Sequence, residues 1–244
     1  MIRGQRANDF NSQFYSAWAE KQLEDPFREI VLQWKAIHLA SLFKRNFPHE
    51  RPGSICEIGG AEGTVLSVVG GLLGARDQFN YEPSGEFCDA GRGKYPGIHF
   101  LNSLFSGNGD RYDVVILSDI LEHVEDEGTL LDDAGARCRF VLIKMPIERS
   151  LSVSVLGYLL RGKTKPLEMV FGSRHYNAHL RGYTVRSALS IIRSRLELIE
   201  WFAIDHSFYY RGSARFAFLR RWVGLSPLMR IFGGSLYILA RGKC

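Results

Sequence analysis

SICEIGGAEG, the stretch Ser54–Gly63, decides the fold class of this sequence. A short apolar run, Ser54–Ile58, is followed at once by a glycine-rich turn and then by a helical pattern over Gly63–Leu73. Glycine lets the backbone turn sharply and lets a ligand approach closely, because no β-carbon obstructs it. A strand, a glycine loop and a helix in this order are typical of α/β sheets that bind ligands at their carboxyl edge. A tight strand–helix turn that binds nothing also uses glycine.

Predicted strands and helices alternate along the chain beyond this loop. Further strands are expected at Gln78–Tyr81, Ile98–Leu101, Asp113–Leu117, Arg139–Lys144, Leu196–Ala203 and Leu236–Ala240. Helices are expected between them at Gly85–Lys94, Glu125–Ala134 and Thr184–Arg195. This alternation predicts an α/β fold with a mostly parallel sheet and right-handed crossovers.

The length of 244 residues predicts a single domain, 1–244, with several parts. Residues 1–50 are expected to form a helical N-terminal cap, with one helix over Phe27–Phe47. Residues 54–145 form the predicted cofactor-binding core. Two long insertions interrupt the alternation. Long connections in a compact domain are usually functional, so we expect these insertions to have a role. The predicted parts after the core are the insertion 146–183, the C-terminal part 184–244 and, within it, the insertion 206–234.

The composition is that of a globular protein, with 45% hydrophobic and 23% charged residues. The net charge of +5 suits an anionic partner or an ordinary solvated basic surface, and the second interpretation is favoured. Residues 1–20 lack the apolar core of a secretory signal, and no apolar run reaches the ~20 residues of a membrane span. The cysteines are widely spaced and form no C-x-x-C pair, which favours a reducing compartment over a disulfide or zinc framework. We therefore expect a cytoplasmic protein. The cysteines are Cys56, Cys88, Cys138 and Cys244.

Glu82 ends the second predicted strand about twenty residues after the glycine loop, where an acid that holds a ribose is expected. Its carboxylate can accept hydrogen bonds from both ribose hydroxyls. The alternative is an acid before the helix of Ser84–Lys94, stabilised by the helix dipole. The combined spacing of the loop and Glu82 favours the ribose.

Asp113–Val124 (DVVILSDILEHV) distinguishes a nicotinamide-dependent dehydrogenase from a protein with a cationic cofactor. Ser118 and Asp119 end the predicted strand, and Glu122 and His123 are expected on a short helix. These residues add acids to one rim of the sheet, which suits a sulfonium better than a pyrophosphate. The chain also has no Tyr-x-x-x-Lys pair of the short-chain dehydrogenase kind.

Over nearly its whole length, roughly Cys56 to Lys243, the sequence resembles the class I S-adenosylmethionine (SAM)-dependent methyltransferase superfamily. The glycine loop resembles its first motif, Tyr81-Glu82-Pro83-Ser84 its second-strand acid, and SDILEHVED the segment after its fourth strand. Ala61 departs from the pattern, since many members have glycine there, but alanine is small enough for cofactor binding. The resemblance implies a Rossmann-like, seven-stranded, mostly parallel sheet whose last strand is antiparallel.

The same resemblance implies the cofactor contacts. Glu57 and the glycine loop would face the methionine part of SAM, and Glu82 would hold the ribose. Ser118 and Asp119 would line the methionine end, with Asn102 or Ser103 near the adenine. The expected cofactor-binding residues are Glu57, Gly59, Gly60, Ala61, Gly63, Glu82, Pro83, Asn102, Ser103, Ser118 and Asp119.

Two narrower resemblances concern the methyl acceptor. Ala178–Thr184 (AHLRGYT) is similar to a segment of bacterial methyltransferases of sugar and cell-surface pathways. Separately, DILEH looks like the D/E-x-x-E-H metal set that small-RNA 2′-O-methyltransferases complete with a distant histidine, and some ubiquinone-pathway enzymes are similar. A divalent ion held there would polarise a substrate hydroxyl. The E-H pair is also common in members that need no metal, which is the favoured interpretation. The metal set would be Asp119, Glu122 and His123 with His175 or His179.

Methyl transfer is an in-line displacement at carbon, so the enzyme mainly aligns the reactants and excludes water. An oxygen or nitrogen nucleophile must also lose a proton, and histidine is the usual base near neutral pH. His123 and His179 are the candidate catalytic residues. His38, His49 and His99 lie where exposed or packed histidines are expected.

These observations predict a methyltransferase for a small hydroxylated or amino metabolite, with O-methylation of a sugar or related biosynthetic intermediate favoured. The alternatives are a lipid-linked or quinone-like acceptor, a metal-assisted RNA 2′-O-methyltransferase, and a non-catalytic cofactor-binding regulatory partner. Nucleic acid is disfavoured because no RNA-binding module is present. The insertions mix apolar and basic residues, at Leu151–Lys165 and Phe208–Phe232. They are expected to form a lid for an anionic or amphipathic acceptor, with peripheral membrane contact left open. No pattern defines an oligomeric state.

Overall fold

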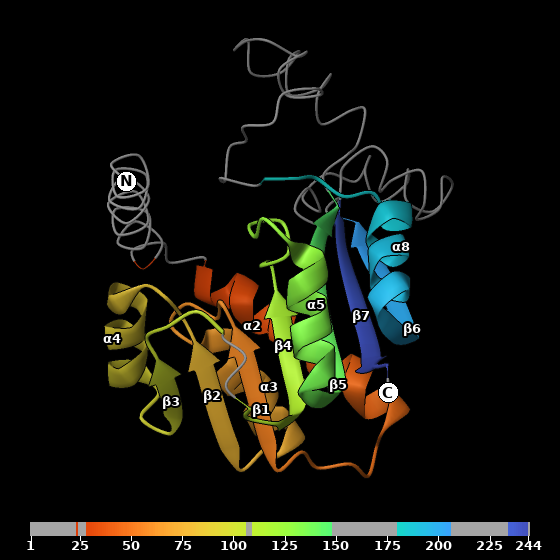
Figure 1. Ribbon diagram of the computed structural model, residues 1–244. Helices are drawn as coiled ribbons and strands as arrows, with labels where there is room; N and C mark the ends of the chain where they lie inside the picture. Colours follow the sequence, from red (N-terminus) through yellow and green to blue (C-terminus); the bar gives the residue numbers. More distant parts are fainter. Residues whose placement is uncertain (1–22, 24–27, 106–108, 148–179, 206–233, 244) are drawn as a thin grey trace, which may run out of the picture. The chain divides into compact units, whose positions relative to one another are not determined.

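The computed structural model describes residues 23, 28–105, 109–147, 180–205 and 234–243 (Figure 1). Among these residues no helix has the length and apolar character needed to cross a bilayer. Most of the N-terminal cap before Arg28 lies outside the described residues, as do nearly all of both predicted insertions. Cys56, Cys88 and Cys138 are not joined in disulfide bonds.

A seven-stranded sheet runs through the described chain in the order β3-β2-β1-β4-β5-β7-β6 (Figure 1). The pairs β1–β2, β1–β4 and β2–β3 are parallel, whereas β7 runs antiparallel to β6. The predicted seven-stranded, mostly parallel sheet with an antiparallel last strand is confirmed. The strands are β1 (Ser54–Ile58), β2 (Asp77–Tyr81), β3 (Ile98–Leu101), β4 (Tyr112–Ser118), β5 (Cys138–Ile147), β6 (Leu196–Asp205) and β7 (Gly234–Gly242).

Five described helices accompany the strands in the predicted alternation. They are α2 (Arg28–Asn46), α3 (Thr64–Leu73), α4 (Gly85–Lys94), α5 (Glu127–Ala136) and α8 (Val185–Arg195). The described residues group into two compact units, Met1–Ser118 with Arg137–Leu142, and Asp119–Ala136 with Ile143–Cys244. The division of 1–244 into cap, core and insertions stays a prediction.

In the first unit, apolar residues of β1, α2 and α3 form the core. Helix α2 packs against α3 and buries Leu42 and Phe43, whereas Ile30 and Ile37 on the same helix are 64% and 47% exposed. The Phe43 ring meets the Phe140 ring edge-on, with centroids 5.3 Å apart. Burial of such apolar surface is the main contribution to folding free energy. This packing holds the strands whose ends carry the glycine loop.

One side chain sets where β1 begins. Asp113, at the start of β4, accepts hydrogen bonds on Oδ2 from the N–H groups of Gly53 (2.7 Å) and Ser54 (3.1 Å). Its own N–H donates to the Ser54 hydroxyl oxygen at 3.2 Å. These bonds fix the register of β1 from its first residue. The position of its last residue, where the glycine loop leaves the sheet, is therefore fixed as well.

In the second unit, α8 packs on α5 and on β6. The helix begins with a reciprocal cap: the Thr184 hydroxyl accepts from the N–H of Ser187, and the Ser187 hydroxyl accepts from the N–H of Thr184. Across the antiparallel pair, the ring of Phe202 stacks on that of Tyr237 with centroids 5.0 Å apart.

Two details differ from the sequence prediction. Strand β5 extends through Pro146 to Ile147, whereas the predicted strand ended at Lys144 and the predicted insertion began at 146. Proline fixes φ and removes one donor N–H from the ladder, and here it lies next to the last residue of the strand. Helix α5 begins at Glu127 rather than Glu125, because the Asp126 carboxylate accepts from the N–H of Thr129 at 3.0 Å and caps the helix there.

Candidate cofactor site

Strands β1, β2 and β3 end at the same edge of the sheet (Figure 1). Ile58 is in register with Tyr81, and Tyr81 with Leu101, so the three following segments start side by side. The predicted cofactor residues of this unit lie there: the glycine loop after β1, Glu82 and Pro83 after β2, and Asn102 and Ser103 after β3. Ligands of parallel α/β sheets bind at such carboxyl edges.

The glycine loop makes a tight turn between β1 and α3. The N–H of Gly59 donates to Tyr81 O, and the N–H of Gly63 donates to Gly60 O, both at 2.8 Å. Gly63, the N-cap of α3, has a φ of 81°, in the left-handed region that favours glycine. Ala61 also has a positive φ, 48°, which is unfavourable for a residue with a β-carbon.

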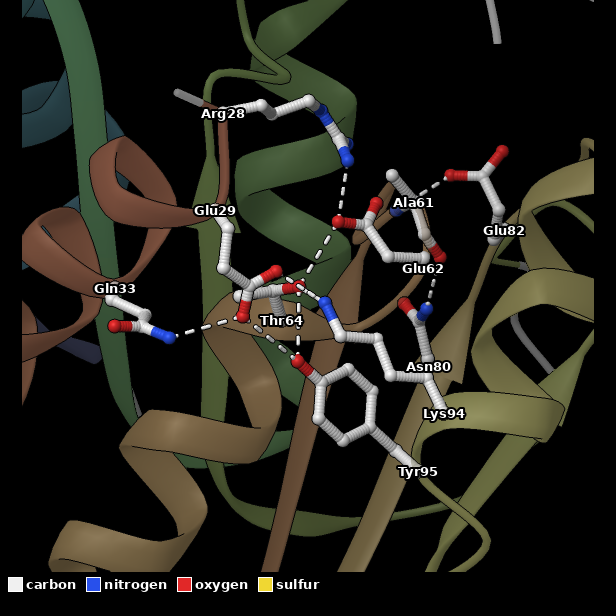
Figure 2. A network of polar contacts seen from close by, with 10 residues as sticks. All are labelled: Arg28, Glu29, Gln33, Ala61, Glu62, Thr64, Asn80, Glu82, Lys94 and Tyr95. Carbon is white, nitrogen blue, oxygen red and sulfur yellow. Dashed lines mark hydrogen bonds and ion pairs between the residues drawn. The ribbon is translucent and has the colours of Figure 1, made fainter. Parts of the chain in front are cut away.

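Gly60 is the position where the loop tolerates no side chain. A β-carbon there would lie 2.4 Å from Asn80 Oδ1 and 2.7 Å from Glu57 Oε2. Asn80 is buried on β2, and its amide group donates to Ala61 O at 2.8 Å (Figure 2). The loop therefore rests on two buried side chains from the adjacent strands.

Glu57 lies beneath the loop and is only 1% exposed. Its Oε2 accepts the N–H of Leu66 at 3.0 Å, which anchors the first turn of α3. Burial, together with the nearby Glu62 and Glu82 carboxylates, raises the pKa of Glu57 to about 8. Glu57 thus supports the loop from inside, and its predicted position against the methionine of SAM stays a prediction.

Glu82 connects the loop to the segment after β2. Its Oε2 accepts the N–H of Ala61 and its Oε1 the N–H of Ser84, both at 2.9 Å. Burial raises the pKa of Glu82 and outweighs these two hydrogen bonds, which lower it. The N-cap of α4 is Ser84, which accepts from the N–H of Phe87. Glu82 is therefore not the capping residue of that helix.

Beside Glu82 the surface is open. The side chains of Pro83, Asn102 and Ser103 are exposed, and the Asn102 amide donates to Glu82 O (3.1 Å) and Pro83 O (2.9 Å). The next residue, Leu104, is 74% exposed and was not singled out from the sequence. A buried carboxylate beside small polar groups and an apolar side chain suits a nucleoside, which presents hydroxyls and a flat ring. Glu62 Oε2 and Asn80 Oδ1 are also buried without a hydrogen-bond partner among the described residues. The donors and acceptors at this edge fit the adenosine part of SAM.

In the second unit, Asp119 follows β4 in the left-handed conformation, with a φ of 54°. Its N–H donates to Lys144 O at 3.0 Å, and its carboxylate is ion-paired with the Lys144 ammonium. Lys144 is 5% exposed. The sequence analysis treated Lys144 only as the end of an apolar strand, although a lysine that ends a buried run needs a partner. Ser118, the last residue of β4, belongs to the first unit and is half-buried.

Glu122 and His123 lie in a turn, not on the short helix predicted from the sequence. The N–H of His123 donates to Ile120 O at 2.9 Å, which closes the turn directly after the left-handed Asp119. A helix cannot continue from a residue in that conformation, so the chain turns before α5 begins. Glu122 is buried and His123 half-buried.

The turn is bonded to the segment that precedes α8. The N–H of Leu180 donates to Glu122 O at 2.8 Å, and the Tyr183 hydroxyl donates to Leu121 O at 3.3 Å. The Arg181 guanidinium donates to the backbone O of Glu125 at 2.6 Å. His175 and His179 lie outside the described residues. Among the residues that are described, no cluster of three or more His, Cys, Asp or Glu side chains is arranged to hold a metal ion.

The comparisons with known proteins agree with this fold. A family model described as a methyltransferase domain matches residues 34–211, so the chain belongs to the methyltransferase domain family. The predicted class, a SAM-dependent methyltransferase, is confirmed. A search of curated proteins finds no match.

Solved structures share the fold at low sequence identity. The magnesium protoporphyrin IX methyltransferase from Synechocystis PCC 6803 with bound SAH, the product S-adenosylhomocysteine, has a TM-score of 0.62 and 12% identity, covering 96% of this chain and 97% of its own. The plantazolicin methyltransferase BpumL with SAH has a TM-score of 0.56 and 16% identity, covering 92% and 94%. A complex with the Trm112 methyltransferase activator of Haloferax volcanii contains a chain with a TM-score of 0.61 and 15% identity, covering 93% and 97%.

Proposed function

We propose that this methyltransferase binds SAM at the edge formed by the loop of Gly59–Gly63, Glu82 and the segment after β3. The observation that carries the proposal is the buried Glu82: its carboxylate accepts from the N–H of Ala61 in the loop, and its backbone O accepts from the Asn102 amide in the exposed segment after β3. In the proposed arrangement Glu82 accepts from the ribose hydroxyls, and the loop backbone faces the methionine. Asn102, Ser103 and Pro83 lie towards the adenine, and Ser118 and Asp119 are assigned to the methionine end. Bound SAM supplies a methyl group on a positively charged sulfur.

Replacing Glu82 with Ala is expected to weaken SAM binding by roughly 1–3 kcal/mol, the usual cost of leaving buried polar partners unmatched. Glu82→Gln is expected to do similar harm, because both carboxylate oxygens accept from backbone N–H groups and an amide NH₂ would face one of these donors. Titration calorimetry with SAM measures the effect. Glu197→Ala removes an exposed glutamate on β6 and is the control. Wild-type SAM affinity in both Glu82 variants would contradict this placement of the cofactor.

We further propose that the acceptor is a small hydroxylated metabolite, most simply a sugar or a related biosynthetic intermediate methylated on oxygen. One segment, singled out by its resemblance to sugar-pathway methyltransferases, supports this: Leu180–Thr184, the described end of the AHLRGYT segment, whose neighbour is the turn with His123. The segment and the turn are hydrogen-bonded to each other within one unit. In the proposed role, His123 or His179 accepts the hydroxyl proton, because imidazole titrates near neutral pH.

The acceptor is tested by following the transfer of an isotope-labelled methyl group from SAM to a defined panel. The panel contains sugar nucleotides, a quinol-like phenol with an apolar tail, a short RNA duplex and magnesium protoporphyrin IX. We expect label on a sugar hydroxyl, unaffected by EDTA and not increased by Mg²⁺ or Mn²⁺. Label on the tailed phenol alone would support the lipid-linked or quinone-like alternative. Label on RNA that EDTA abolishes would support the metal-assisted alternative. Intact SAM binding with no transfer to any acceptor would support a regulatory partner and contradict the proposal.

A further inference from the structure

An ion pair joins the first turn of α2 to the glycine loop, across 34 positions of sequence (Figure 2). The Arg28 guanidinium donates from Nη1 to Glu62 Oε1 at 2.5 Å, and the Thr64 hydroxyl donates to the same oxygen at 3.0 Å. Glu62 lies between Gly60 and Gly63, inside the loop itself. The sequence analysis quoted Glu62 within the loop but assigned it no role, and it gave no role to Arg28.

The pair is removed from solvent, unlike most ion pairs among the residues that the structure describes. The side chains of Arg28 and Glu62 are 13% and 3% exposed, whereas those of Arg76 and Asp77 are 82% and 39% exposed. Exposed pairs contribute little to stability, but a charge left buried without its partner is costly. The Arg28–Glu62 pair is therefore energetically coupled to the loop conformation.

Arg28 also balances the charge of the loop. Glu57 and Glu82 flank the loop from β1 and β2, and the negative charge of Glu62 raises the pKa of each of them. The Arg28 guanidinium lies over the Phe87 ring of α4, with its Cζ 5.5 Å from the ring centroid. It is thus held between an aromatic face and a carboxylate, where a planar guanidinium fits well.

A second set of contacts holds the first turn of α2 in place. The Thr64 hydroxyl lies 3.2 Å from the Tyr95 hydroxyl, which donates to Glu29 Oε1 at 3.4 Å. Glu29 is ion-paired with Lys94 and accepts from the Gln33 amide at 3.0 Å (Figure 2). The start of α2 therefore meets both the loop and the end of α4 through side chains.

We infer that Arg28 is a positioning residue for the cofactor loop: it holds Glu62, and with it the loop of Gly59–Gly63, in the conformation that binds SAM. The state of the first turn of α2 and the affinity for the cofactor are then coupled. This inference rests on the placement of SAM at the loop proposed above. Arg28, which lies 34 positions before Glu62, then contributes to SAM affinity, and the balance of charge around the loop affects that affinity as well.

The test compares SAM and SAH affinities by calorimetry in Arg28→Met, Arg28→Lys and Glu62→Gln. Arg28→Met is expected to weaken binding of both ligands about tenfold or more, since a buried hydrogen-bonded charge loses its partner. Arg28→Lys keeps the charge and is expected to recover part of the loss. The ratio of the two affinities reports charge: SAM carries a sulfonium that SAH lacks. Arg28→Met, which leaves Glu62 uncompensated, shifts the ratio towards SAM, and Glu62→Gln, which leaves Arg28 uncompensated, shifts it towards SAH.

Arg76→Met makes the same chemical change at an exposed ion pair before β2 and is expected to alter neither affinity. If Arg28→Met binds both ligands like Arg76→Met, the inference is wrong. Equal loss of both ligands in Arg28→Met and Glu62→Gln, with a lower melting temperature, would show a role in stability alone and would also overturn it. If Arg28→Met does not fold, the ratio of SAM affinity to SAH affinity is still measured in Arg28→Lys and Glu62→Gln. Glu82→Ala separates the two proposals, because wild-type SAM affinity in that variant contradicts the cofactor placement itself.

Discussion

Gly60→Ala is expected to abolish productive SAM binding and to lower the free energy of unfolding by about 2–6 kcal/mol. The new β-carbon would lie 2.4 Å from Asn80 Oδ1 and 2.7 Å from Glu57 Oε2, far inside van der Waals contact. Neither neighbour can move freely, because Asn80 donates to Ala61 O and Glu57 accepts from the N–H of Leu66. Overpacking and broken buried hydrogen bonds each cost roughly 1–3 kcal/mol. Thermal melting and calorimetry with SAM measure the two effects, and we expect at least about a hundredfold loss of affinity.

Gly71→Ala is the matched control for this substitution. Gly71 lies in α3, and a β-carbon there would have no atom within 4 Å. Alanine is favoured over glycine inside a helix by about 0.5–1 kcal/mol, so this variant should melt at a slightly higher temperature and bind SAM normally. A Gly60→Ala protein as stable as Gly71→Ala, with the same SAM affinity, would mean that the loop is not supported as described.

His123→Ala is expected to lower turnover about 10²–10⁴-fold with the acceptor identified by the labelling panel, the usual effect of losing a general base. His123 is half-buried in a turn that is closed through Ile120 O by a backbone hydrogen bond, so removing the imidazole leaves the turn intact. SAM affinity is therefore expected to remain at the wild-type value. Single-turnover kinetics measures the rate of methyl transfer, and calorimetry measures the binding.

His179→Ala is measured in parallel, because both histidines were predicted as candidate bases. His49→Ala removes an exposed histidine and is the control. The two candidates are distinguished by which variant loses transfer while still binding SAM. Full turnover in both His123→Ala and His179→Ala would show that the reaction proceeds by alignment alone. A His123→Ala variant that loses SAM affinity along with turnover would point to a structural role for the turn.

Most of the fold was predictable because its signals are local. The run of Ser54–Ile58, the glycines after it and the helical pattern of α3 each determine a conformation within a few residues, and β1 was predicted with the bounds that the structure shows. The same is true of β3 and α4. Glycine, proline and apolar periodicity suffice for such elements.

The details around the fourth strand were not predictable in the same way. The turn of Glu122 and His123 depends on the left-handed conformation of Asp119, whose N–H and carboxylate are both engaged by Lys144, 25 positions away. The contact of Arg28 with Glu62 is likewise a consequence of tertiary packing. No periodicity within either segment encodes such pairs, so the sequence indicated the acids but not their partners.

Ala61 has a consequence for the loop when no ligand is bound. A glycine at this position would be free to sample both signs of φ, whereas alanine restricts the accessible conformations and pays about 1–2 kcal/mol in the left-handed one. Two hydrogen bonds offset that penalty: the N–H of Ala61 donates to Glu82, which follows β2, and the O of Ala61 accepts from Asn80, which lies in β2. The loop is therefore preorganised, and SAM bound in the proposed position would cost less conformational entropy than it would with a mobile glycine. In this enzyme, the neighbouring strand rather than the ligand supplies the order of the loop.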